Sequence, residues 1–264
     1  MSELDPWNGL RRFTDARIGL GRSGSAMPTR EVLAFTMAHA QARDAVMTAL
    51  DWMPIELGIA TIGFETMQVA SAVSDRSEYL RRPDLGRKLS ANSRQDILQV
   101  ASKQDQPPDL VIVVGDGLSS KAVEANIVSM LTALLPHLQK ARWHLAPVIL
   151  ANDARVALGD EIGELLGAKA SLVLIGERPG LSSPDSLGAY LTYQPRVGLK
   201  DAERNCISNI RLRGLSYDEA AFKMIWLLKE AFRRGMTGVE LKDESVFQIE
   251  SSPRPAEISN IPEF

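Results

Sequence analysis

Uninterrupted runs of apolar residues, separated by helix-like segments, organise the second half of the chain. Leu110–Val114 and Ser171–Ile175 are two such runs, rich in branched side chains and almost free of polar ones. Strands buried on both faces of a parallel sheet have this composition, because neither face meets water. A further strand is expected at Leu145–Leu150. Strand, turn and helix therefore alternate after about residue 109, which predicts an α/β domain.

Apolar residues spaced three and four apart predict the helices between these strands. One long helix is expected after residue 120, and a short one at Asp160–Leu166. The apolar face of the long helix comprises Val123, Ile127, Met130, Leu131, Leu134 and Leu138. Ser216 and Glu219 have the spacing of a capping box, and Gly235 suits the end of the helix that they would begin. With right-handed crossovers, this half would be a Rossmann-like, doubly wound domain.

The first 106 residues show a different pattern, with many alanines and arginines and long helical periodicity. A helix is predicted after Pro28, whose fixed φ suits a helix start, with Glu31 placed favourably in the first turn. A stripe of mostly small residues runs along one side of this predicted helix: Phe35, Ala38, Ala42, Ala45 and Ala49. The stripe would let another helix approach closely, either from this chain or from a partner. A second helix is expected at Ser93–Lys103.

Polar and proline residues at 103–109 mark the boundary between the two parts. We therefore expect a mainly helical region at 1–106, available for partner contact, and a Rossmann-like domain at 107–250. The segment 251–264, rich in serine, proline and glutamate, is expected to be a loosely held tail. The pattern leaves the path of residues 53–80 open.

Composition narrows the class of protein. The chain has 264 residues, of which 45% are hydrophobic and 24% charged, as in globular proteins. Its net charge of −3 and the lack of a long single-sign run argue against nucleic acid or an anionic membrane as a partner. No apolar run approaches the roughly 18 residues of a membrane span, and the N-terminus lacks signal-peptide features. The single cysteine, Cys206, cannot form an intramolecular disulfide, so we expect a reducing, cytoplasmic location.

Two glycine-containing loops should lie at the carboxyl ends of the strands, where ligands bind in doubly wound domains. Gly115–Ser120 precedes a helix N-terminus, and Gly176–Gly180 adds a carboxylate and a guanidinium. Their glycines either let a ligand approach the backbone or merely turn the chain. A nicotinamide dinucleotide is not favoured, because a serine replaces the third small residue of the Gly-x-Gly-x-x-Gly fingerprint. In addition, residues 126–152 contain no acidic residue that could hold the ribose.

Residues for other chemistry are scarce in this chain. Neither a P-loop nor a Gly-x-Ser-x-Gly elbow is present in the sequence. His39, His137 and His144 have no second ligand at metal spacing, so we expect packing roles for them and no metal site. Cys206 would need a histidine partner to act as a nucleophile, and otherwise it is an inert thiol.

Several short stretches, taken in order, resemble one family. They are TDARIGLGR at 14–22, PT at 28–29, HAQARDAV at 39–46, RPDLG at 82–86, GDGLS at 115–119, VALGDEIG at 156–163, GERPG at 176–180 and CISNI at 206–210. From about residue 10 to 240 the chain resembles the small (light) subunit of ethanolamine ammonia-lyase, an adenosylcobalamin-dependent lyase. Each motif alone is weak, whereas the ordered series is specific.

The resemblance implies a hetero-oligomeric enzyme whose large, barrel-shaped subunit holds ethanolamine, while the small subunit caps the cobalamin. Cleavage of the cobalt–carbon bond would start a radical reaction that yields acetaldehyde and ammonia. The acid, base and substrate-orienting groups would lie on the large subunit, so no catalytic residue is expected here. The implied location is the cytoplasm, in a bacterial microcompartment, although no targeting helix stands out at either terminus.

The family's cobalamin-contacting positions match Val156, Glu177 and Cys206 in this chain. Glu177 would accept hydrogen bonds from corrin amides or the nucleotide tail, Val156 would supply an apolar contact or a backbone group, and Cys206 would form a wall. Without a cofactor, Glu177 would pair with a nearby arginine (Arg178 or Arg204), and Val156 would pack in the core. Further candidate contacts are Asp116 and Gly117.

The histidines bear on how cobalamin would bind. Some cobalamin proteins replace the cofactor's own base with a histidine from an Asp-x-His-x-x-Gly motif. Met37, Leu135 and Arg142 stand two positions before the three histidines here, so that motif is absent from the sequence. Binding is therefore expected to be base-on, with dimethylbenzimidazole on cobalt. An alternative function is a non-catalytic cofactor-binding or scaffold module of the same fold, and a nicotinamide-dependent oxidoreductase ranks third.

Overall fold

The computed structural model describes residues 6–246, so the expected tail at 251–264 lies outside the described residues. The strands are β1 (Thr66–Ala70), β2 (Leu110–Gly115), β3 (Val148–Asn152), β4 (Ala170–Gly176), β5 (Leu187–Tyr193) and β6 (Asn205–Ile210). The α-helices are α1 (Thr29–Met47), α2 (Trp52–Thr61), α3 (Arg76–Arg81), α4 (Ala91–Ser102), α5 (Ser120–Ala141), α6 (Leu158–Leu166) and α7 (Tyr217–Arg234). Short 3-10 helices are η1 (Pro6–Phe13), η2 (Leu85–Arg87) and η3 (Asp201–Glu203). Within residues 6–246, none of the helices has the length and apolar character needed to span a membrane.

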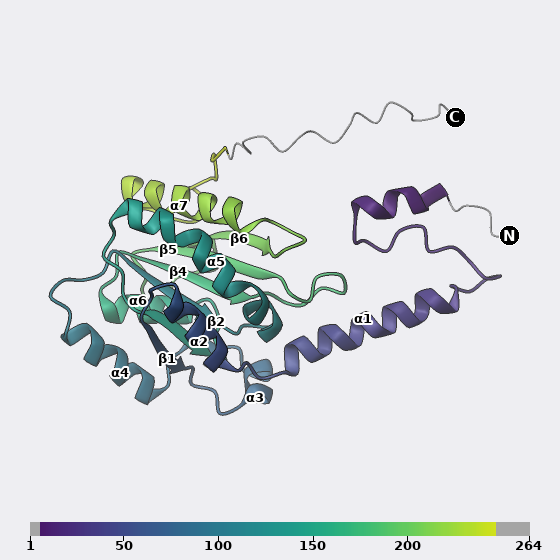
Figure 1. Ribbon diagram of the computed structural model, residues 1–264. Helices are drawn as coiled ribbons and strands as arrows, with labels where there is room; N and C mark the ends of the chain where they lie inside the picture. The colour runs from purple at the N-terminus through teal and green to yellow at the C-terminus, as the bar shows by residue number, and fades with distance from the viewer. Residues whose placement is uncertain (1–5, 247–264) are drawn as a thin grey trace.

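A six-stranded sheet of order β1-β3-β2-β4-β5-β6 forms the centre of the molecule (Figure 1). The first four of these strands are parallel, whereas β5 is antiparallel to β4 and β6 to β5. The α/β class is thereby confirmed, but a Rossmann-like, doubly wound fold is not, because the sheet is mixed. The cause lies after β4, where residues 177–186 contain no crossover helix. A short connection can only return the chain beside β4 in the opposite direction.

Side chains of the central strands alternate between two hydrophobic cores. Leu110, Ile112 and Val114 of β2 pack with α2, α5 and α7 on one face of the sheet. Val111 and Val113 pack with α4 and α6 on the other face. All five side chains are at most 2% exposed. Both faces of β2 are therefore dry, which explains why the sequence shows no polar alternation along this strand.

Most of the helices and strands expected from the sequence occur within a few residues of their predicted positions. The strand expected at 145–150 instead begins at Val148, and Leu145 makes only an isolated bridge to Leu110. Between them Pro147 has no N–H to donate to the ladder. Helix α7 begins where Ser216 Oγ accepts from the N–H of Glu219 at 3.3 Å, and it ends at Gly235, whose φ is 72°. The helix end at Gly235 and the N-cap at Ser216 are confirmed, but of the two bonds of the expected capping box only the one accepted by Ser216 is present among the described residues.

Several elements have weaker sequence signals, and the pattern missed them. Residues 53–80, left open above, contain most of α2, all of β1 and most of α3. Strand β1 pairs with β3 at one edge of the sheet, and β5 and β6 form the other side. Edge strand β6 has exposed residues at Cys206, Ser208 and Asn209, so its apolar pattern is broken. Strand β1 belongs to the same sheet as the later strands, and α2 and α4 pack on that sheet, so the α/β structure includes residues before 106. The division into domains stays a prediction.

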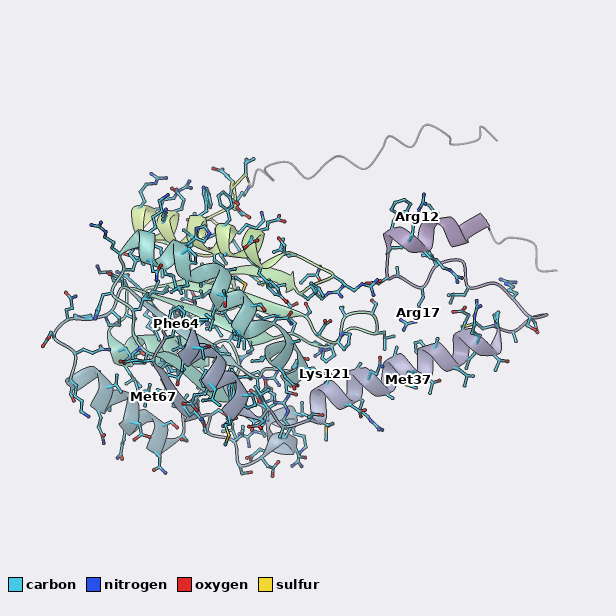
Figure 2. All side chains as sticks on the ribbon, viewed as in Figure 1. Arg12, Arg17, Met37, Phe64, Met67 and Lys121 are labelled. Atoms are coloured by element: carbon cyan, nitrogen blue, oxygen red, sulfur yellow. The ribbon has the colours of Figure 1, made fainter. Side chains whose placement is uncertain are left out.

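Helix α1 projects from the body of the molecule and contacts it near its C-terminal end (Figure 1). There Ala45 is buried, and Ser120 Oγ donates to the carbonyl oxygen of Thr48 at 2.8 Å. Farther toward the N-terminus, Phe35 is 46% exposed. Met37, labelled on α1 in Figure 2, is 62% exposed. The stripe that begins at Phe35 is therefore packed at its Ala45 end and open to solvent at its other end.

Candidate functional site

A cavity of about 460 Å³ opens where the parallel strands end. Its walls come from the loops that follow β2, β3 and β4, together with α3 and β5. The lining residues are Tyr79, Gly117, Leu118, Arg155, Val156, Ile175, Gly176, Glu177, Arg178 and Tyr190. Neighbouring strands β2 and β3 lead into α5 and α6 on opposite faces, which separates their loops and leaves this crevice. The cavity thus occupies the place that the sequence predicts for a ligand.

The glycines of the two loops allow the loops to touch. Gly117 has a φ of 59°, and a Cβ placed on it would lie 2.2 Å from the carbonyl oxygen of Gly176. A Cβ on Gly176 would lie 2.1 Å from the carbonyl oxygen of Ser119. Side chains are excluded at both positions by protein backbone, because real Cβ contacts are not this short. These two glycines therefore pack the loops together while also lining the cavity.

Glu177 follows β4 directly, and the structure holds its carboxylate through neutral donors. Its backbone N–H donates to the carbonyl oxygen of Ser186 at 2.9 Å, and its Oε2 accepts from Ser186 Oγ. The N–H of Asn209 donates to the same Oε2 at 3.2 Å. Gly188 leaves room for this arrangement, because a Cβ there would lie 3.0 Å from Glu177 Cγ. The carboxylate is thereby oriented at the cavity wall.

The alternative role of Glu177 was an ion pair with an arginine. Across residues 6–246, Glu177 has no such pair, since Arg204 instead binds Asp160 and Asp201. Arg178 lines the cavity and is exposed. That alternative is therefore wrong for the described part of the chain, and the carboxylate remains available to a ligand.

Val156 and Cys206 stand in different relations to the cavity. Val156 lines it from the β3–α6 loop and also packs against the core beneath α4 and α6. Cys206 is exposed on β6, with its Sγ 3.3 Å from Ser208 Oγ, and it is not among the lining residues. It pairs with Tyr190, which does line the cavity, and such partners share one face of the sheet. Cys206 thus extends the wall beyond the cavity, and its contact with cobalamin stays a prediction.

Asp116 joins the loops after β2 and β3 from a buried position beside the cavity. Its Oδ1 accepts from the N–H of Ala154 at 3.1 Å. The Nη1 of Arg76 lies 3.0 Å from Asp116 Oδ2 and 3.0 Å from Asp153 Oδ1. Burial raises the pKa of Asp116 to about 6, an effect that Arg76 opposes and Asp153 reinforces. Of the two further candidate contacts, Gly117 lines the cavity, whereas Asp116 holds the adjoining loops together.

Sequence reasoning missed Tyr79 and Arg155, which form one wall of the cavity. The Tyr79 ring is buried, and its hydroxyl donates to the carbonyl oxygen of Ala154 at 2.9 Å. The guanidinium of Arg155 lies over this ring at 4.2 Å from the centroid. The only sequence signal for Arg155 was its place directly before Val156, and Tyr79 comes from a segment whose path was open.

The three histidines lie away from the cavity wall. His39 is on α1 beside Phe35, with ring centroids 6.5 Å apart. His137 is near the end of α5, and the ring of His144 lies 3.4 Å from the carbonyl oxygen of Pro107, at the opposite, amino-terminal ends of the strands. Within residues 6–246, no group of three or more histidine, cysteine or acidic side chains is arranged to hold a metal ion.

The arrangement favours binding over acid–base catalysis. Among its lining residues, the cavity presents one carboxylate, two guanidinium groups, two tyrosines and apolar surface, without a histidine or a second carboxylate. Nucleophilic or general acid–base mechanisms require a paired donor and acceptor at the reacting atom. Ligand binding suits this wall better, because a few fixed polar groups orient a ligand against mostly apolar surroundings.

Comparison with known proteins identifies similar sequences along nearly the whole chain. The family model described as ethanolamine ammonia-lyase light chain matches residues 4–242. A protein of Pseudomonas fluorescens (strain Pf0-1), named ethanolamine ammonia-lyase small subunit, is 53% identical over 244 residues, or 92% of this chain and 89% of that relative. A protein of the same name from Rhodopseudomonas palustris (strain BisA53) is 52% identical over 245 residues, covering 93% of both chains.

Replacing Asp116 with asparagine tests the electrostatics beside the cavity. The pKa of Asp116 rises from its ordinary 3.8 to about 6 on folding, so the folded state binds this proton more tightly. Its contribution to the free energy of unfolding is complete below about pH 4 and is lost as the pH rises through 6. Because an asparagine side chain cannot ionise, Asp116→Asn should gain on the order of 3 kcal/mol relative to the native chain between pH 4 and 7.

Urea unfolding of both proteins across this pH range measures that difference. Asp105→Asn, at an exposed position, is the matched control and should show no pH-dependent difference. A constant difference between Asp116→Asn and the native chain would mean that Asp116 has an ordinary pKa in the folded protein.

Proposed function

Because the chain belongs to the ethanolamine ammonia-lyase light-chain family, we propose that it is the small subunit of an enzyme that converts ethanolamine to acetaldehyde and ammonia. The observation that carries the proposal is the family match over residues 4–242, with about half of the residues identical to small subunits. The cavity supports it, because Val156 and Glu177 lie together there. We also propose that it works in the cytoplasm, within a microcompartment.

Adenosylcobalamin is the cofactor that this proposal requires, and the cavity suits one side of it. A corrin macrocycle carries many amide groups around an apolar ring. Glu177 would accept hydrogen bonds from such amides, Val156 and Ile175 would contact the ring, and Cys206 would extend the wall. The cavity of about 460 Å³ is smaller than a whole cobalamin, so this chain would cover only part of the molecule. A partner subunit would enclose the remainder.

When bound, the cofactor supplies radical chemistry that amino-acid side chains do not provide. The residues of this chain would bind and orient it and keep water from the reaction space. The lack of an acid–base pair among the lining residues is consistent with substrate being held by the large subunit. The lack of an acid–base pair also fits a specific alternative, a cofactor-binding module without turnover. The reconstitution experiment below distinguishes the two.

Helix α1 is the surface that we assign to the large subunit. Its outer part exposes several apolar side chains, and exposed apolar groups that cluster on one element mark interaction sites. They are Val32, Leu33, Phe35 and Met37. The helix contacts the body mainly at its other end, which leaves this part free to pack against a second chain.

Reconstitution tests the proposed function directly. The chain should co-purify with the large subunit of an ethanolamine ammonia-lyase. The complex should release acetaldehyde from ethanolamine only when adenosylcobalamin is added. Activity of the large subunit alone, equal to that of the complex, would show that this chain is unnecessary. Assembly and cofactor binding without acetaldehyde release would favour the non-catalytic module.

Glu177→Ala tests the assigned cofactor contact. Loss of a charged acceptor should raise the apparent Kd for adenosylcobalamin roughly 10- to 100-fold, as measured by absorbance titration of the assembled complex. Gel filtration should show unchanged assembly with the large subunit. Glu240→Ala, which removes an exposed carboxylate elsewhere, is the control. An unaltered Kd in the Glu177 variant would remove this residue from the site.

The histidine positions favour base-on binding, because none of the three lines the cavity. We therefore expect dimethylbenzimidazole to remain the lower axial ligand of cobalt. Electron paramagnetic resonance of the cob(II)alamin form, prepared with ¹⁵N-labelled protein, distinguishes the two sources of nitrogen. A superhyperfine pattern from unlabelled nitrogen is expected. A pattern from ¹⁵N would mean that a protein residue replaces the base.

A further inference from the structure

Arg155 is held rigidly at the cavity wall. Its backbone N–H donates to the carbonyl oxygen of Gly86 at 2.8 Å, and its Nη2 donates to the carbonyl oxygen of Tyr79 at 3.4 Å. The guanidinium stacks on the Tyr79 ring, and Gly86 leaves room for this, because a Cβ there would lie 3.0 Å from Arg155 Cγ. The side chain is half-buried, so its orientation is set before any ligand arrives.

A second arginine beside Tyr79 provides a comparison within the same structure. The guanidinium of Arg76 lies 4.6 Å from the ring centroid and is neutralised by Asp116 and Asp153, each at 3.0 Å. For Arg155, by contrast, residues 6–246 provide no carboxylate within 4.0 Å, and its buried Nε has no hydrogen-bond partner among them. Two guanidinium groups contact one ring, and in the described part of the chain the one facing the cavity has no counter-ion, whereas Arg76 has two.

A half-buried charge without a counter-ion is costly, because part of its hydration is lost without compensation. A bound anion would restore the balance. The planar fork of a guanidinium matches the oxygens of a phosphate or carboxylate, with which it forms paired, charge-assisted hydrogen bonds. The cavity is also lined by a second guanidinium, that of Arg178. Its lining therefore carries two positive groups against one carboxylate, that of Glu177. The wall at Arg155 therefore suits an anionic part of a ligand, and the wall at Glu177 suits hydrogen-bond donors.

We propose that Arg155 binds a phosphate oxyanion and that, in the complete enzyme, this anion is the phosphodiester of the cofactor's nucleotide loop. The inference rests on the proposed function, because it takes cobalamin as the ligand. Cobalamin carries one phosphodiester, which joins the corrin side chain to the ribose of dimethylbenzimidazole. Arg155 would thus select corrinoids that retain this phosphate, while Glu177 binds amide groups that all corrinoids share.

Three corrinoids separate these contributions. Adenosylcobinamide lacks the whole nucleotide loop, adenosylcobinamide phosphate carries the phosphate without the base, and adenosylcobalamin has both. Each is titrated into the complex of this chain with the large subunit, and Kd is measured by absorbance. The native complex should bind the two phosphate-containing corrinoids more tightly than adenosylcobinamide.

Arg155→Met keeps much of the apolar stem and removes the charge. It should raise Kd for adenosylcobalamin and adenosylcobinamide phosphate roughly 10- to 100-fold and leave Kd for adenosylcobinamide within about twofold. Arg155→Lys keeps the charge but not the planar guanidinium, so its Kd for the phosphate-containing corrinoids should fall between those of the native chain and Arg155→Met. Arg196→Met, at an exposed arginine in the β5–β6 loop, is the control and should resemble the native chain.

Unchanged binding of adenosylcobinamide also reports that the variant is folded and assembled. Equal weakening of all three corrinoids by Arg155→Met would make Arg155 a structural residue and overturn the inference. The inference would also be overturned if Arg155→Met still preferred the phosphate-containing corrinoids as strongly as the native complex does. If inorganic phosphate binds the native complex while the corrinoids with and without phosphate bind equally, the ligand is free phosphate and the assignment to the cofactor is wrong. A native complex that binds none of the three corrinoids would instead contradict the proposed function itself.

Discussion

The contact between the loops that follow β2 and β4 is the constraint on which the cavity depends. The N–H of Leu118 donates to the carbonyl oxygen of Gly176 at 2.9 Å, and neither Gly117 nor Gly176 has space for a side chain. These loops can meet because β2 and β4 are adjacent parallel strands with dry faces, so their ends are fixed side by side. Glu177 is the residue directly after Gly176, so its backbone is held in place by the same contact. The cavity is therefore a property of strand order as much as of loop sequence.

Charge is distributed unevenly around this contact. Buried Asp116 and its neighbour Asp153 share Arg76, whereas Arg155 on the same aromatic ring faces the cavity with no counter-ion from residues 6–246. The carboxylate of Glu177 is oriented by a hydroxyl and a backbone N–H and leaves the cavity's guanidinium groups unneutralised. Such a wall can position a large ligand that has both donors and an anion. Among its lining residues it offers no acid–base pair for proton transfer, as the proposed cofactor-holding role would require.

Size and exposure lead to the same view of the molecule as part of a larger assembly. The cavity would cover one side of the proposed cobalamin at most, and α1 extends away from the sheet with apolar side chains exposed. A monomer gains no stability from apolar groups in water, whereas an interface that buries them does. The proposed large subunit would account for both features, because it would enclose the ligand and cover the helix.

The sequence by itself determined the local features: the buried strands at Leu110 and Ser171, most helices, the glycine loops and, through family motifs, Val156 and Glu177. It did not determine the antiparallel strands β5 and β6, the edge position of β1, or the cavity wall made by Tyr79 and Arg155. Periodicity reports the burial of each segment and carries no information about which segments pair. Those pairings depend on contacts distant in sequence, such as Arg155 with Tyr79 or Cys206 opposite Tyr190. Tertiary structure alone therefore decided that Arg155 faces the cavity and that Cys206 lies beside it.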